Sequence, residues 1–421
     1  MNSRRSCYVY LQLPGTLDVV TCARYVREVL RDGRVVGRFV YGRSYRERAD
    51  AVPLDPYLLP VTPRRYETAK LDGMFGALRD ASPDGWGRRV IEKVTGRADL
   101  DELDFLLQGP EDRAGALSFG LGPTPPGPVR KFNRILQLAD LRRAAQLVEE
   151  AAPGEPVPDQ VAQLLDPGTS LGGARPKSVV EDDDGLWIAK FPQRGDRWNN
   201  APVEGAMLGL AARCGIRTPE FRVERIGDDS VLLVKRFDRA RVEGGYHRHR
   251  MVSALTVLGA EDRVTERANW SYLLLADELR RWSERGMADR EELFRRVVFN
   301  ALISNLDDHP RNHALIAPGR GWHLAPAYDL TPQPAIGLER RDLALECGPL
   351  GRMARRDNLL AAAGRFGLES DRASAIIDEM KQAIARHWRA EVRRLGGTEG
   401  DCALIEPAFV YAGFEYPTEP S

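Results

Sequence analysis

Residues 305–313 read Asn-Leu-Asp-Asp-His-Pro-Arg-Asn-His and place Asp307 five residues before Asn312. A short apolar strand over 313–317, a Pro-Gly-Arg-Gly turn and a second strand are expected next, and Asp329 follows them. A hairpin of this size returns the chain beside its start. The side-chain oxygens of Asn312 and Asp329 are therefore expected to face one metal ion.

This order of residues is typical of protein-kinase active sites. There the first Asp accepts the proton of the attacking hydroxyl, while the Asn and the later Asp hold magnesium on the ATP phosphates. Two other interpretations stay open on this segment alone. Either aspartate of the pair can cap a turn in a solvated loop. The same turn also carries side chains that suit the metal of a hydrolase, namely Asp307, Asp308, His309 and His313.

An apolar strand over 186–191 carries a single lysine, Lys190. In kinases a lysine on such a strand is directed at the α- and β-phosphates of ATP, so Lys190 is a candidate phosphate ligand. Fourteen residues later, Glu204 lies in a stretch with helical apolar spacing over 203–214. A glutamate in this place pairs with the lysine in kinases, and the alternative for Glu204 is an ordinary surface position.

Residues 169–178 read Thr-Ser-Leu-Gly-Gly-Ala-Arg-Pro-Lys-Ser. Two adjacent glycines followed by a lysine predict a backbone nest that binds phosphate, although a Gly-Gly pair is also typical of a turn. Lysines are scarce in this arginine-rich chain, yet Lys177, Lys190 and Lys235 all fall in suspected nucleotide segments. The compact charge of lysine suits phosphate. The order of all these segments is that of a kinase, from its N-lobe to its C-lobe.

Five motifs in this order resemble the HipA serine/threonine kinases, the toxins of bacterial HipBA toxin–antitoxin modules. They are Ser170-Leu-Gly-Gly-Ala-Arg-Pro-Lys177, Ile188-Ala-Lys-Phe-Pro192, Val234-Lys-Arg-Phe-Asp-Arg239, Asn305-Leu-Asp-Asp-His-Pro-Arg-Asn312 and Ala325-Pro-Ala-Tyr-Asp329. The segments 75–80 and 82–89 also resemble the N-terminal subdomain of that family. The resemblance therefore covers most of the chain.

The resemblance implies a role for each matching position. Asp307 corresponds to the general base, Asn312 and Asp329 to the magnesium ligands, and Lys190 to the lysine that binds the ATP phosphates. The rest of the catalytic loop corresponds to His309, Pro310, Arg311 and Asn312. The flexible phosphate loop corresponds to Gly172, Gly173, Ala174, Arg175, Pro176 and Lys177. The hinge strand, which contacts adenine through backbone groups, corresponds to Lys235, Arg236 and Phe237.

Ser170 matches the loop serine that these kinases autophosphorylate, which ejects the loop and inactivates the enzyme. A phosphate adds about two negative charges. Those charges would repel ATP from the neighbouring triphosphate site and break the glycine nest, so the implied regulation has a physical basis. The alternative for Ser170 is a hydroxyl that caps a turn.

Composition favours a cytosolic enzyme. Basic and acidic residues balance at 61 each among 421 residues, so no strong attraction to naked nucleic acid or to an anionic membrane is expected. The five cysteines are scattered without a C-x-x-C pair, which disfavours a disulfide framework or a structural zinc site. Neither a signal peptide nor an apolar run of membrane-spanning length is apparent. The cytoplasm is the expected location.

The expected fold is α+β: a bilobal protein-kinase-like fold with a small β-rich N-terminal subdomain and a mainly helical C-lobe. Alternating residues over 7–48 predict strands. After residue 239 the apolar spacing becomes helical, over 270–282, 291–304, 358–366 and 373–395. The expected division is an N-terminal subdomain (1–122), a Pro-rich linker (123–128), a kinase N-lobe with the phosphate loop (129–240) and a helical C-lobe (241–421).

These features predict a serine/threonine kinase that uses ATP and Mg²⁺ and inactivates itself by phosphorylation on Ser170. By resemblance, the substrate would be a translation factor such as an aminoacyl-tRNA synthetase, whose phosphorylation inhibits growth. The partner would be a HipB-like helix-turn-helix antitoxin, with DNA contacted only through it and no membrane contact. Two alternatives stay open: a small-molecule kinase of the aminoglycoside or choline type, and a pseudokinase that acts as an antitoxin-bound corepressor.

Overall fold

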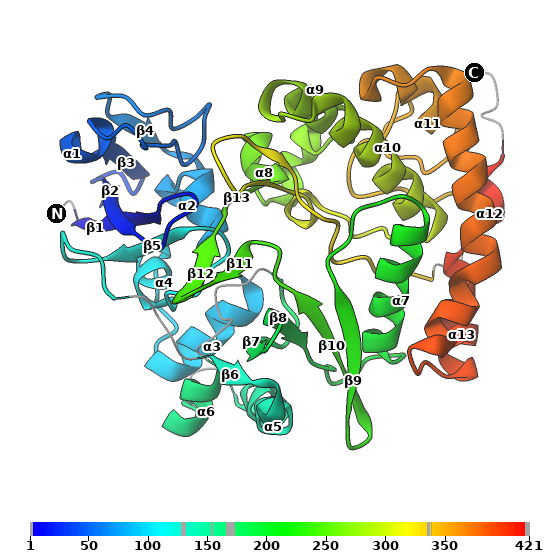
Figure 1. Cartoon of the computed structure of the whole chain (residues 1–421), viewed down its shortest axis with the longest axis horizontal. Helices are drawn as coiled ribbons and strands as arrows, with labels where there is room; N and C mark the ends of the chain where they lie inside the picture. The colour runs from blue at the N-terminus through cyan, green and yellow to red at the C-terminus, as the bar shows by residue number, and fades with distance from the viewer. Residues whose placement is uncertain are drawn as a thin grey trace. The chain divides into compact units, whose positions relative to one another are not determined.

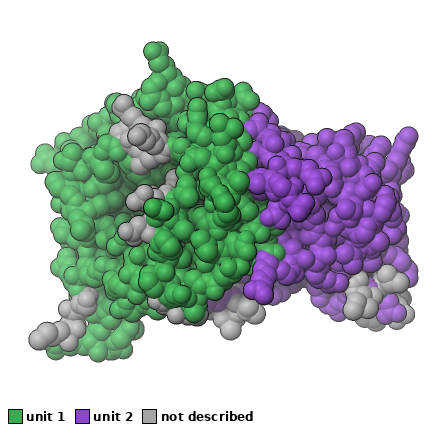
Figure 2. All heavy atoms as spheres, turned by 90° about the horizontal axis from the view of Figure 1, so that it is seen from below, with its two compact units in different colours: residues 1–193, 235–252, 316–320 green, residues 194–234, 253–315, 321–421 purple. Residues whose placement is uncertain are grey.

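In the computed structural model (Figure 1), the chain divides into two compact units, which Figure 2 shows in different colours. It describes residues 3–127, 132–152, 155–165, 173–334, 337 and 339–416. Unit 1 contains residues 1–193, 235–252 and 316–320, and unit 2 contains residues 194–234, 253–315 and 321–421. Each unit therefore combines segments that are distant in the sequence. The four-part domain division expected from the sequence stays a prediction.

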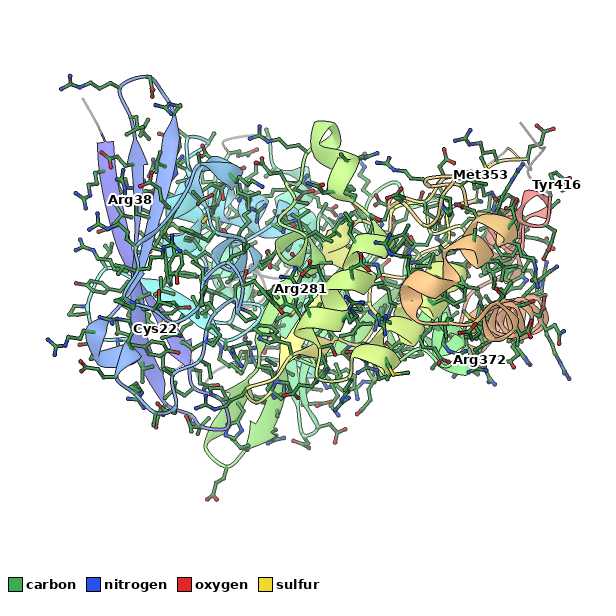
Figure 3. The ribbon with its side chains drawn as sticks, turned by 90° about the horizontal axis from the view of Figure 1, so that it is seen from above. Cys22, Arg38, Arg281, Met353, Arg372 and Tyr416 are labelled. Carbon is green, nitrogen blue, oxygen red and sulfur yellow. The ribbon has the colours of Figure 1, made fainter. Side chains whose placement is uncertain are left out.

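An antiparallel five-stranded sheet forms the N-terminal part of unit 1, in the order β4-β3-β2-β1-β5. Its strands are β1 (Ser3–Gln12), β2 (Val19–Val29), β3 (Val35–Tyr41), β4 (Tyr66–Thr68) and β5 (Leu117–Gly120). Side chains such as Cys22 and Phe39 are fully buried, whereas Arg38 on β3 pairs with Glu28 near the surface (Figure 3). The strand pattern expected over 7–48 is confirmed.

Short helices and a second group of strands complete unit 1. The helices are α1 (Arg43–Arg46), α2 (Gly76–Asp80), α3 (Gly85–Thr95), α4 (Glu102–Gln108), α5 (Leu138–Glu150) and α6 (Asp159–Leu165). The strands are β6 (Asn133–Arg134), β7 (Lys177–Asp182), β8 (Gly185–Lys190), β11 (Arg239–Val242), β12 (Gly245–Arg248) and β13 (Arg250–Ser253). In the tight turn between β7 and β8, the Asp182 carboxylate accepts hydrogen bonds from the N–H groups of Asp184 and Gly185.

Unit 2 is mainly helical. It contains the hairpin of β9 (Phe221–Ile226) and β10 (Asp229–Lys235) up to residue 234, the first half of β14 (Ala314–Ala317) and the strand β15 (His323–Leu324). Its helices are α7 (Asn200–Arg213), α8 (Ala254–Val257), α9 (Tyr272–Trp282), α10 (Gly286–Leu302), α11 (Arg356–Ala362), α12 (Ser370–Arg394) and α13 (Glu399–Ile405). The long helix α12 packs against α7, and α9 packs against α10 (Figure 1). None of the described helices has the length and apolar character that crossing a bilayer requires.

The helices expected from apolar spacing are present, but α10 begins at Gly286 and not at residue 291. The apolar residues of its first turn, Met287 and Ala288, are adjacent and exposed, so they did not extend the apolar spacing of the buried face. Asp289 in this turn is nevertheless buried, because its carboxylate accepts hydrogen bonds from the Ser283 hydroxyl (2.6 Å) and the Leu324 N–H (2.7 Å). The chain thus combines sheets and helices, as expected for a mixed α and β protein.

Candidate nucleotide and phosphoryl-transfer site

The loop over 305–313 follows α10 in unit 2 and is fixed where it leaves the helix. Ser304 has a left-handed backbone with φ 53°, and its hydroxyl donates to the carbonyl of Ala408 at 2.6 Å. Asn305 donates from its backbone N–H (2.8 Å) and its side-chain amide (3.1 Å) to Asn300. Left-handed backbone is uncommon for residues other than glycine and persists where its surroundings determine it.

Asp307 lies exposed at the tip of this loop. Its backbone carbonyl accepts hydrogen bonds from the His309 N–H (2.8 Å) and from the side-chain amide of Asn312 (3.3 Å). These two bonds fix the turn and leave the Asp307 carboxylate on the outside of it. A carboxylate held in this way is open to a substrate hydroxyl.

Asp308 has the opposite environment, with 1% of its surface exposed. One carboxylate oxygen accepts hydrogen bonds from the Tyr272 hydroxyl, the Asn300 side-chain amide (2.7 Å) and Nε2 of His313 (2.7 Å). Burial, together with the charge of Asp308, raises the pKa of Tyr272 well above its usual range, so the phenol stays protonated and donates. The turn-cap alternative is therefore wrong for Asp308, because its carboxylate binds three side chains, two of which come from the helices α9 and α10.

This arrangement does not support the metal-hydrolase alternative. His313 is hydrogen-bonded to Asp308, and Asp307 points to the surface. Within the part of the chain that the structure describes, no three His, Cys, Asp or Glu side chains are placed to hold a metal ion together.

Asn312 and Asp329 are brought near each other by the hairpin of β14 and β15. The N–H of Ala325 donates to the Ala314 carbonyl at 2.9 Å. The hydroxyl of Tyr328, the residue before Asp329, donates to the carbonyl of Arg311, the residue before Asn312, at 2.7 Å. The expected return of the chain is confirmed.

The backbone at Asp329 is left-handed, with φ 59°. Such a conformation at a residue other than glycine is found where the surrounding structure imposes it, often at functional sites. The backbone conformation of Asp329 is therefore a second indication, besides the motif, that this residue belongs to a functional site.

Lys177 and Lys190 are directly opposite each other on β7 and β8 in unit 1, so their side chains leave the same face of the sheet. Two ammonium groups on one face would both attract a bound phosphate. A methyl group built on Gly173 would lie 2.7 Å from Nζ of Lys177, and Gly173 has φ 96°. The end of a lysine side chain can move aside, so it is the positive φ at this position that favours glycine.

The expected phosphate loop is described only from Gly173 onward. Ser170 and Gly172 lie outside the described residues. Glu204 is buried on α7 in unit 2 with 5% of its surface exposed. Its pairing with Lys190, which belongs to unit 1, stays a prediction.

The expected hinge, residues 235–237, has well-defined neighbours within unit 1. The N–H of Arg236 donates to the Leu186 carbonyl at 2.8 Å, and Nδ1 of His249 lies 3.2 Å from the Phe237 carbonyl. Burial lowers the pKa of His249, so the ring is neutral at pH 7. The amino group of Lys235 lies over the Trp187 ring, 5.6 Å from its centroid.

The side chain of Arg236 is fully buried and is not available to bind nucleotide. It makes five hydrogen bonds: two from Nη1 to Asp112, one each from Nε and Nη2 to Asp238, and one from Nη2 to the carbonyl of Arg113. A guanidinium has five N–H donors. Arg236 therefore has none left for nucleotide, and only its backbone remains a candidate contact.

Unit 1 also contains a cavity of about 450 Å³ that the sequence did not indicate. It is lined by residues from the end of β1, from β7 and from the β11–β12 hairpin, including Gln12, Glu181, Arg239, Tyr246 and Arg248. No predicted nucleotide-binding residue lines it.

Two family models match the chain. The model of the HipA-like C-terminal domain covers residues 169–388, and the model of the HipA N-terminal domain covers residues 17–120.

Two curated relatives come from Sinorhizobium fredii. The putative kinase Y4dM is 29% identical over 235 residues, which are 51% of this chain and 54% of that protein. The putative kinase Y4mE is 25% identical over 398 residues, 86% of this chain and 91% of that protein. The chain thus spans about half the length of the first relative and nearly all of the second.

A chain in the solved complex of Shewanella oneidensis HipA, HipB and operator DNA has a TM-score of 0.68 and 18% identity, with 95% of this chain and 94% of that chain covered. This likeness shows the fold. Because the model of the HipA-like C-terminal domain alone spans more than half of the sequence, the chain belongs to the HipA family.

Proposed function

We propose that this protein is a serine/threonine protein kinase that uses ATP and Mg²⁺. The observation that carries the proposal is the loop over 305–313, where Asp307 is exposed beside a buried Asp308 and where Asn312 is brought near Asp329. This is the set of side chains that kinases use for phosphoryl transfer. Membership of a family whose curated relatives are named putative kinases supports it.

In the proposed reaction, Asp307 accepts the proton of a substrate hydroxyl. The hydroxyl oxygen forms a bond to the γ-phosphorus of ATP while the bond to the β-phosphate oxygen breaks, so that ADP leaves. The Lys190 ammonium, and that of Lys177 opposite it, would pair with the phosphates. The buried hydrogen bonds of Asp308 keep the loop in one conformation, which holds Asp307 in place between turnovers.

Asn312 and Asp329 fit the ligand preference of Mg²⁺, which takes oxygen ligands and is usually held by one or two protein side chains together with substrate phosphates. The amide nitrogen of Asn312 donates to the Asp307 carbonyl, so its carbonyl oxygen is the atom left to face a cation. When bound, Mg²⁺ neutralises the charge on the β- and γ-phosphates.

The acceptor and partner follow from the family resemblance. The solved relative is a complex of HipA, HipB and operator DNA, and we propose a HipB-like antitoxin as partner, with DNA contact through it. The proposed acceptor is a protein hydroxyl, in a translation factor such as an aminoacyl-tRNA synthetase. Autophosphorylation of Ser170 is proposed as the inactivating step.

Replacing Lys190 by Met is expected to weaken ATP binding by about 10- to 100-fold, because a hydrogen bond to a charged group contributes roughly 1.5–3 kcal/mol. The dissociation constant for ATP with Mg²⁺, measured by calorimetry, tests this. Lys381→Met is the matched control, since Lys381 pairs with Glu415 on an exposed surface. Equal affinities for the two variants would contradict the role of Lys190.

A further inference from the structure

A cluster of four buried charges lies directly beside the proposed hinge. It consists of two arginines and two aspartates, each with less than a tenth of its surface exposed: Asp112, Arg236, Asp238 and Arg239. In addition to the five bonds of Arg236, Arg239 donates to Asp238 (2.8 Å) and to Asp112 (3.2 Å). The charges sum to zero, so each carboxylate is needed to balance the buried guanidiniums.

The cluster joins the two family domains inside unit 1. Asp112 lies in the HipA N-terminal domain, whereas Arg236 and Arg239 belong to the HipA-like C-terminal domain. A backbone contact strengthens the junction, since the Gly115 N–H donates to the Asp238 carboxylate at 2.9 Å. Burial alone would raise the pKa of Asp238, but the two guanidiniums outweigh it and hold that pKa well below its usual range. Asp238 is therefore ionised at neutral pH.

Removing one partner from such a cluster leaves an uncompensated buried charge, which is strongly destabilising. With Asp112 neutral, the two buried guanidiniums of Arg236 and Arg239 would share one carboxylate, that of Asp238. Arg236 lies in the hinge and Arg239 follows it by two residues, so a shift of these side chains that relieves the excess charge would displace the backbone of residues 235–237. The position of the hinge thus depends on an aspartate of the N-terminal domain.

A second contact of the N-terminal domain holds the described part of the phosphate loop. Trp86, at the start of α3, is fully buried. Its backbone N–H donates to the Gly173 carbonyl (3.0 Å) and its indole Nε1 donates to the Lys177 carbonyl (3.0 Å). The preceding Gly85 allows this approach, because a Cβ there would lie 3.0 Å from Cα of Ala174. One residue, through its backbone and its side chain, therefore holds both Gly173 and Lys177.

We propose that the HipA N-terminal domain helps to form the nucleotide site. Its residue Asp112 positions the hinge that binds adenine, and its residue Trp86 positions the loop that binds the phosphates. This inference rests on the proposed ATP-dependent function. It gives the N-terminal domain a role in nucleotide affinity. By linkage, any ligand that alters these contacts alters ATP affinity, and ATP alters the affinity for that ligand by the same factor.

Substitutions at the two positions are expected to differ in selectivity: one affects ATP alone, and the other affects ATP and adenosine alike. Trp86→Phe keeps the ring but removes the donor to Lys177, so it is expected to weaken ATP binding about 5- to 20-fold and to leave adenosine binding unchanged. Asp112→Asn keeps the shape but removes the charge, and it is expected to weaken adenosine and ATP alike, by about 10-fold or more. Asp112→Glu, which restores the charge, is expected to recover part of the loss.

The measurement is calorimetric titration of the full-length wild type and each variant with adenosine and with ATP, alongside thermal unfolding. Glu67→Gln is the control, because it breaks the Arg38–Glu67 pair (2.8 Å) between β3 and β4 of the same domain, on strands that carry neither contact. For a wild type that binds, unchanged affinities in both folded variants would overturn the inference, and so would an equal loss in the control. If Asp112→Asn does not fold, Trp86→Phe decides the question. A wild type that binds neither ligand would overturn the proposed function and, with it, the inference.

Discussion

Replacing Asp307 by Asn is expected to slow phosphoryl transfer by about 100- to 10,000-fold, the usual contribution of a general base. The amide has nearly the same shape but cannot accept the proton of the attacking hydroxyl. Because the Asp307 carboxylate is exposed, the free energy of unfolding should change by no more than about 0.5 kcal/mol. The rate of phosphate incorporation at saturating ATP, measured with the thermal unfolding midpoint, checks both parts.

The control for this variant is Asp262→Asn. Asp262 is another exposed aspartate of unit 2, and it pairs with Arg311 of the loop at 2.7 Å. This change keeps the catalytic set complete and should alter the rate only slightly. If the Asp307→Asn variant transfers phosphate at the wild-type rate, Asp307 is not the general base.

Replacing Asp308 by Ala is expected to lower the free energy of unfolding by about 3–5 kcal/mol, the cost of removing one partner from a buried charged network. Three donors lose their acceptor, on Tyr272, Asn300 and His313, and each is buried. Urea unfolding followed by circular dichroism measures the change.

Asp262→Ala serves as the comparison for stability, since a surface ion pair contributes only about 0–1 kcal/mol. If both alanine variants unfold at the same urea concentration, the hydrogen bonds of Asp308 do not stabilise the loop. The contrast between Asp307 and its neighbour would then have no physical basis.

The elements that could be predicted from the sequence are those encoded by a local pattern of residues. Alternation over 7–48 indicated the strands of the N-terminal sheet, and three- and four-residue spacing indicated α9 and α12. The hairpin between Asn312 and Asp329 could be read from two short strands and a turn. In each case the residues that determine the structure are close together in the sequence.

Contacts between distant segments could not be predicted. Asp308 is buried and Asp307 is exposed because Tyr272 and Asn300 come from two helices, which no spacing within the loop reveals. Arg236 was expected among the nucleotide ligands, but its side chain is bound by Asp112, 124 residues away in the sequence. The sign that the sequence offers is the presence of three charged residues, Arg236, Asp238 and Arg239, shortly after the apolar strand over 231–234.

The most direct test of the proposed function is the intact mass of the purified protein after incubation with Mg²⁺ and ATP, followed by peptide mapping. Asp307→Asn and Ser170→Ala are treated in parallel. We expect one added phosphate on Ser170 of the wild type and none on either variant. Phosphate on an added metabolite and not on protein would instead indicate a small-molecule kinase. No phosphate on a folded protein purified unphosphorylated, together with no ATP binding, would contradict the kinase proposal and favour a pseudokinase that acts as a corepressor.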